Sequence, residues 1–129
     1  MRISNIDTIP ATRFDGYNNR VDRWVSRLKK LIIDDGVRVI GDHAFQYGFF
    51  EEVEVSASVE RYGSYWCRGT HINKITFFGD VTPYYYWFTS SLKQFICKGQ
   101  VQAFNAPAGF PSTTELYDLS GCQTIPQLS

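Results

Sequence analysis

Apolar residues recur along this chain at intervals of 20 to 22 positions. When the segments that begin at residues 28, 50, 72, 92 and 113 are aligned, apolar side chains fall in shared columns. The first two columns are Leu31, Val53, Ile75, Phe95, Leu116 and, two residues later, Ile33, Val55, Phe77, Cys97, Asp118. The later columns are Val37, Val59, Val81, Val101, Cys122, then Ile40, Tyr62, Tyr84, Phe104, Ile125, and finally Phe45, Cys67, Phe88, Phe110. An internal period of this length is typical of a solenoid.

Each repeat is predicted to begin with a short β-strand. Positions 31 and 33 alternate with positions 30, 32 and 34, which is the period of a strand with one buried and one wet face. Successive strands should stack in parallel into a curved sheet, while the later columns return the chain along the far side. We therefore expect one domain, residues 1–129, with about four to five repeats of 20–22 residues over positions 28–125.

One segment also resembles a known family. Residues 28–48, LKKLIIDDGVRVIGDHAFQYG, resemble one repeat of the BspA-type leucine-rich repeat proteins, with the match at Val37, Ile40, Gly41, Ala44 and Phe45. The later repeats keep the apolar columns but not the residue identities of this motif. The resemblance implies an α/β leucine-rich repeat solenoid, a curved ladder that binds other molecules, often proteins, and catalyses no reaction.

Residues 1–27 are expected to hold a half-repeat and a helical cap. The half-repeat is indicated by Ile6, Ile9 and Phe14, which suggests that the chain starts halfway through a unit. Within residues 18–30 a helical spacing is carried by Val21, Trp24, Val25 and Leu28. Such an amphipathic helix would cover the first strand of the solenoid. At the other end, Asp118 in a core column is interpreted as an inward charge that discourages edge-to-edge pairing.

The aromatic run VTPYYYWF, residues 81–88, divides between core columns and three further rings, Tyr85, Tyr86 and Trp87. In the repeat alignment Tyr86 falls beside Tyr65 and Trp87 beside Trp66, which predicts a continuous aromatic strip. Two interpretations stay open. The rings could fill a loosely packed convex side and shield one another, or they could form a contact patch, since Tyr and Trp dominate binding hot spots.

The wet face of the strands is the other candidate surface. Its middle column is Ile32, Glu54, Thr76, Ile96, Tyr117, flanked by Lys30, Glu52, Lys74, Gln94 and by Asp34, Ser56, Phe78, Lys98. Exposed apolar residues grouped on a concave sheet often mark a docking site. The candidate partner-binding residues are therefore Ile32, Glu52, Glu54, Thr76, Phe78, Ile96 and Tyr117 on this face, and Tyr85, Tyr86 and Trp87 in the strip.

Composition narrows the class of partner. The chain has 13 basic and 13 acidic residues, so no global field attracts nucleic acid or an acidic membrane surface. Residues 1–30 nevertheless carry a net charge of +4 (seven basic, three acidic), and residues 31–60 one of −6 (one basic, seven acidic). No apolar run approaches the ~20 residues of a membrane span, and residues 1–16 lack the apolar stretch of a secretion signal. The chain as written is expected in the cytoplasm, or on an extracellular surface if it is a fragment.

The sequence offers no catalytic constellation. There is no G-x-S-x-G, phosphate-binding glycine loop or H-E-x-x-H motif, and the three cysteines lack the spacing of a zinc site. We therefore expect a non-enzymatic binding module without metal or cofactor, a monomer or weak homodimer that recognises a protein partner. Two alternatives stay open: a small inhibitor whose acidic surface blocks a host enzyme, and a structural segment of a larger surface array.

Overall fold

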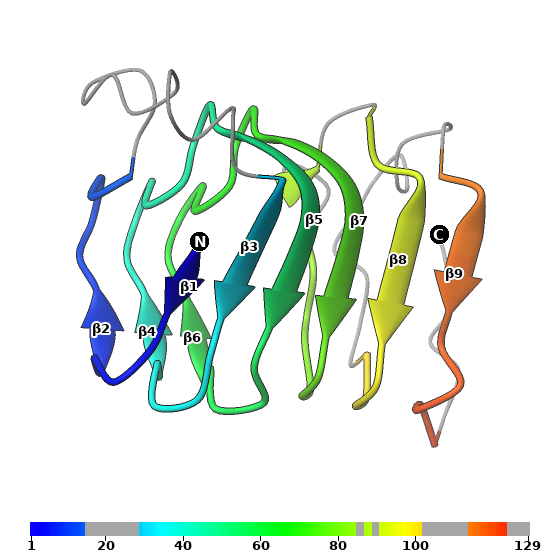
Figure 1. Ribbon diagram of the computed structural model, residues 1–129. Coiled ribbons are helices and arrows are strands. Elements are labelled where there is room, and N and C mark those ends of the chain that lie inside the picture. The colour runs from blue at the N-terminus through cyan, green and yellow to red at the C-terminus, as the bar shows by residue number, and fades with distance from the viewer. Residues whose placement is uncertain (15–28, 85–86, 89–90, 102–113, 124–129) are drawn as a thin grey trace.

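The computed structural model describes residues 1–14, 29–84, 87–88, 91–101 and 114–123. These residues form a parallel β-solenoid, and no α-helix occurs among them (Figure 1). A six-stranded sheet contains β1 (Arg2–Ile3), β3 (Lys30–Ile33), β5 (Phe49–Val55), β7 (His71–Phe77), β8 (Gln94–Cys97) and β9 (Leu116–Asp118). A three-stranded sheet contains β2 (Thr8–Ile9), β4 (Val39–Ile40) and β6 (Arg61–Tyr62).

The chain alternates between the two sheets along the solenoid axis. The successive pairs β1 and β2, β3 and β4, and β5 and β6 make about three turns, and every pairing within the two sheets is parallel. Each turn donates backbone N–H groups to the turn before it, as Gly63 does to the Ile40 carbonyl at 2.7 Å. The prediction of a solenoid of stacked parallel strands is confirmed.

The register confirms most of the predicted rows. Leu31, Val53, Ile75 and Phe95 pair in series, and each is at most 1% exposed. The last strand departs from the prediction, because Phe95 pairs with Tyr117 and Ile96 with Asp118. The spacing there is 22 residues, not 21, and a slip of one residue turns every side chain of a strand to the opposite face.

This slip corrects two assignments. Tyr117 belongs to the inner face, where its ring packs against the core at 6.1 Å from the ring of Phe95. Asp118 lies on the outer side, where its carboxylate accepts a hydrogen bond from the Ser120 hydroxyl at 2.6 Å. The predictions of a wet-face Tyr117 and an inward Asp118 are therefore wrong.

The N-terminal segment begins with a strand. Ile3 of β1 pairs with Ile33, so the expectation that the chain starts halfway through a unit is wrong. The predicted equivalence of Ile9 with Ile40 is confirmed by the pairing of β2 with β4. Residues 15–28 lie outside the described part, and with them most of the predicted helix; Lys30, its predicted last residue, starts β3.

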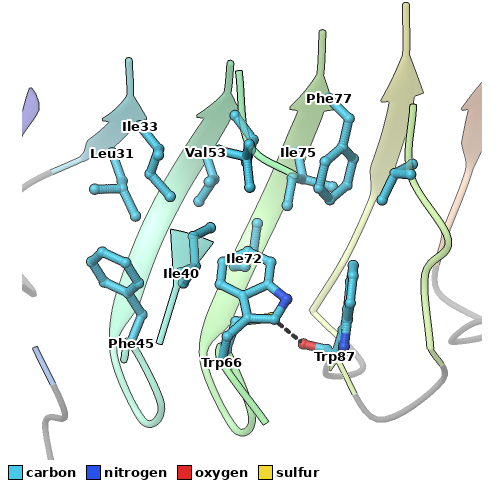
Figure 2. Close-up of a cluster of buried hydrophobic side chains, with 14 of the residues drawn as sticks. Leu31, Ile33, Ile40, Phe45, Val53, Trp66, Ile72, Ile75, Phe77 and Trp87 are labelled. Atoms are coloured by element: carbon cyan, nitrogen blue, oxygen red, sulfur yellow. Dashed lines mark hydrogen bonds between the residues drawn. The ribbon is translucent and has the colours of Figure 1, made fainter. Parts of the chain in front are cut away.

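The core lies between the two sheets and the turns that join them. In Figure 2 the side chains of Leu31, Val53 and Ile75 reach inward from the six-stranded sheet toward Phe45 and Trp66. Large apolar side chains that are less than 2% exposed fill this core. Burying each one stabilises the fold by about 1.5–3 kcal/mol.

A proline marks the end of the three-stranded sheet. The N–H groups of Val39 and Arg61 donate to the preceding turn, to Asp7 at 3.1 Å and to Arg38 at 3.2 Å. The residue 22 positions after Arg61 is Pro83, which has no N–H to continue this ladder. The three-stranded sheet accordingly stops at β6.

The segment after β7 pairs with the following turn and not with β6. Val81 forms a parallel bridge with Val101 of the following turn. A hollow of about 480 Å³ remains beside β6, with Tyr62 and Tyr84 among its lining residues. The missing ladder hydrogen bond thus leaves an interruption in an otherwise regular stack.

The corners between the sheets repeat a strained backbone geometry. Thr12, His43 and Tyr65 occupy equivalent places in successive turns, and their φ angles are 57°, 56° and 56°. This left-handed conformation turns the chain sharply and costs a non-glycine residue roughly 1–2 kcal/mol. Their neighbours are held by turn-to-turn hydrogen bonds, such as Phe45 N–H to the Trp66 carbonyl at 2.7 Å, which offset that cost.

Candidate binding face

The side of the six-stranded sheet that points away from the core is here called the outer face. Register places four of the predicted binding residues in one row across β3, β5, β7 and β8: Ile32, Glu54, Thr76 and Ile96. A neighbouring row contains Lys30, Glu52, Lys74 and Gln94. Phe78 follows β7 directly and alternates with the buried Phe77, so it points outward as well.

These side chains differ in how much of them a partner could reach. Phe78 is 46% exposed, whereas Ile32 and Ile96 are half-buried. Thr76 is only 6% exposed, so its prediction as a wet-face contact is wrong. It is the shortest side chain of its row and lies between the longer Glu54 and Ile96 on the adjacent strands.

Charges on the outer face largely pair with one another. The Lys30 ammonium lies 2.8 Å from Glu54 and 3.4 Å from Glu52. Hydrogen bonding to Glu54, and then to Glu52, raises the pKa of Lys30. One lysine therefore bridges the two carboxylates Glu52 and Glu54.

A second ion pair lies at the β1 end. The Arg2 guanidinium contacts the Asp34 carboxylate, which also accepts a hydrogen bond from the Asp35 N–H at 2.8 Å. The Asp35 N–H, followed by Arg2, holds the pKa of Asp34 below its usual value. Arg2 was missed in the sequence because β1 is only two residues long and stands 30 positions before its partner, outside the 22-residue period.

A shallow hollow of about 370 Å³ joins these groups. Its walls include Ile32, Phe78, Glu54, Ser56 and Asp34. Apolar surface therefore lies directly beside carboxylates that already pair with basic side chains. This arrangement favours contact with a mixed apolar and polar surface over the capture of a strongly charged ligand.

The predicted aromatic strip is mostly interior. Trp66 and Trp87 are neighbours as predicted, with ring centroids 5.5 Å apart, but they are 0% and 2% exposed (Figure 2). Trp87 therefore belongs to the core and is not an exposed partner contact. Its ring also packs against Tyr62, at 5.0 Å, because the column of Ala44 turns inward at this corner. Tyr85 and Tyr86 lie outside the described residues.

The cysteine thiols and histidine rings are buried, hydrogen-bonded or stacked against neighbouring side chains. Burial raises the pKa of Cys67, whose Sγ donates to the Trp87 carbonyl at 2.9 Å. Burial also raises the pKa of Cys97 to about 11, which keeps this thiol protonated at neutral pH. The His43 ring nitrogen Nδ1 lies 2.8 Å from Gln46 Oε1, and His71 stacks on Phe49 at 4.3 Å.

Comparison with protein-family models, curated proteins and solved structures finds no match to this chain. Within the described ranges no cluster of three or more His, Cys, Asp or Glu side chains is placed to hold a metal ion. Nor does the described part of the chain contain a helix long and apolar enough to cross a membrane. The class that the fold defines is a parallel β-solenoid.

Proposed function

We propose that this protein is a non-enzymatic binding module that recognises a protein partner through the outer face. The observation that carries the proposal is the grouping of Ile32, Ile96 and Phe78 on one sheet face, where Lys30 pairs with Glu52 and Glu54. Exposed apolar side chains that share a sheet face commonly mark a docking surface.

The paired charges favour the apolar residues as the source of affinity. Lys30 pairs with Glu52 and Glu54, and Arg2 pairs with Asp34. Such exposed pairs contribute little to stability on their own. They do, however, lower the net charge that a partner meets, so electrostatic attraction is the smaller part of the proposed recognition.

We also propose that the solenoid is of the leucine-rich repeat type, with a BspA-like unit at residues 28–48. The residues that match the BspA-type repeat are also those that pack in this unit. Val37, Ile40, Ala44 and Phe45 are at most 1% exposed. Gly41 is required as well, because a Cβ atom there would lie 2.5 Å from the Ala11 nitrogen in the preceding turn.

The test begins with a pull-down from the source cell that compares wild type with an Ile32→Arg, Ile96→Arg double variant. The captured protein is then purified, and its affinity for each variant is measured by calorimetry. We expect the double variant to bind at least about 30-fold more weakly, which is the loss typical of a central binding residue. Circular dichroism confirms that both proteins are folded.

An Ile6→Arg variant is the matched control. Ile6 is 42% exposed, lies in the segment that joins β1 to β2, and does not line the hollow of the outer face. Hydrogen exchange of the complex should protect amides of β3, β5, β7 and β8. The proposal fails if the double variant binds within about twofold of wild type, if Ile6→Arg loses as much affinity, or if neither protein captures a partner.

A further inference from the structure

A second site lies beside β6, where the three-stranded sheet is interrupted. The hollow of about 480 Å³ described above is lined by three aromatic residues, Tyr62, Tyr84 and Trp87, and by two acids, Glu60 and Asp80. Its volume falls within the range of small-molecule sites in proteins, roughly 300–1,000 Å³. Ala57 lines both this hollow and the hollow of the outer face, but Ile32, Ile96 and Phe78 are not part of its lining.

The three rings adjoin one another at oblique angles. Trp87 is 5.0 Å from Tyr62, with 40° between the ring planes, and 5.8 Å from Tyr84, with 50° between the planes. Tyr84 is 38% exposed and supplies the accessible wall, while Trp87 and Tyr62 are largely buried and lie deeper. All three rings line the hollow, and the face of an aromatic ring attracts a cation.

The electrostatics of the lining agree with this geometry. Glu60 and Asp80 are both acidic, and none of the described residues that line the hollow is basic. Glu60 also pairs with Arg38, which is not part of the lining, and Asp80 accepts a hydrogen bond from the Gln100 N–H at 2.9 Å. Burial raises the pKa of Tyr62, so its phenol stays neutral and its ring keeps the neutral quadrupole.

We propose that this hollow binds an alkylated ammonium group, held against the exposed ring of Tyr84, with Tyr62 deeper in the hollow, and attracted by the carboxylate of Asp80. Alkylation matters because a methylated ammonium is less strongly hydrated than a free one and loses less on entering an aromatic site. Two sources share this chemistry: a free choline-like molecule and the methylated lysine side chain of a peptide.

Calorimetric titration with choline tests the inference, and its neutral isostere 3,3-dimethylbutan-1-ol is the matched ligand control. The two molecules have the same shape, so only the cation differs. We expect choline to bind about tenfold more tightly than the neutral alcohol, in keeping with the usual strength of a cation–π contact. A trimethyllysine peptide compared with its unmethylated form then shows whether the free molecule or the peptide is preferred.

Two variants locate the binding. Tyr84→Ala should weaken choline binding about tenfold, while Tyr65→Ala, which removes a tyrosine that is equally exposed at 38% elsewhere, should leave it unchanged. Asp80→Asn removes the charge but keeps an oxygen for the Gln100 N–H, and it should weaken binding severalfold even if Tyr84→Ala does not fold. Equal binding of the neutral alcohol, no effect of either variant, or no binding of choline or peptide would overturn the inference.

Discussion

Replacing Phe45 and Phe78 by alanine, one at a time, tests which face of the solenoid is buried and which is exposed to solvent. The two changes delete the same atoms from residues that are 1% and 46% exposed. Phe45 stacks on Phe14 with ring centroids 5.1 Å apart and meets Phe50 edge-on at 6.3 Å. Removing it leaves a cavity lined by these rings, and we expect a loss of about 3–5 kcal/mol in the free energy of unfolding.

The same deletion at Phe78 should cost less than about 1 kcal/mol, because much of that ring is in water already. The whole chain of 129 residues is expected to be stable by only about 6–19 kcal/mol, so the loss at Phe45 is a large share of the total. Urea unfolding measures both: with a slope of about 2 kcal/mol/M, the midpoint for Phe45→Ala should fall by about 1.5–2.5 M.

Agreement between circular dichroism and fluorescence checks that each variant unfolds in one step. Comparable losses for the two variants would refute the reasoning, because Phe78 would then be packed against something and the outer face could not be a free surface. A stable Phe78→Ala protein, by contrast, becomes a clean reagent for the binding experiment.

Three further changes test other parts of the structure. Thr70→Val removes a buried hydroxyl that donates to a backbone carbonyl and should cost about 1–3 kcal/mol in urea unfolding, whereas Thr70→Ser should cost less because it keeps the donor. Tyr117→Ser should destabilise by about 1–3 kcal/mol and Asp118→Ser by about 0.5 kcal/mol or less; the reverse order would contradict the observed register. In native protein at pH 8, the half-buried Cys122 should react with a disulfide reagent well before Cys97, whose raised pKa leaves little thiolate; equal rates would contradict the burial of Cys97.

The stacked strands were predictable because each repeat shows the same apolar pattern, imposed by the same packing requirement. Alternation at residues 31 and 33 recurs at 53 and 55 and at 75 and 77, so a single chance substitution could not hide it. The last copy occurs at the end of the series, with no further copy to fix its register. There the apolar Leu116 was aligned where the amphipathic Tyr117 belongs, and the two assignments differ by one position and by the whole face.

The corners were harder to predict, because neither the strand period nor the helix period applies to them. Ala44, Trp66 and Trp87 share a column, and the sequence placed that column correctly but not its direction. Left-handed residues such as His43 turn the chain sharply, so alternation cannot be followed through them. The clue was the size of the indoles, since two adjacent tryptophans are more easily buried by each other than left in water.

The two proposed sites follow from opposite properties of the same repeat. The outer face depends on regularity, because only an unbroken register brings Ile32 and Ile96, which are 64 positions apart in the sequence, into one row. The hollow beside β6 depends on a break, because Pro83 cannot donate the hydrogen bond that would draw the next turn onto β6. The rings of Tyr62, Tyr84 and Trp87 line this hollow. The variants of the two proposals change different residues, Ile32 and Ile96 in one and Tyr84 and Asp80 in the other, which allows each proposal to fail by itself.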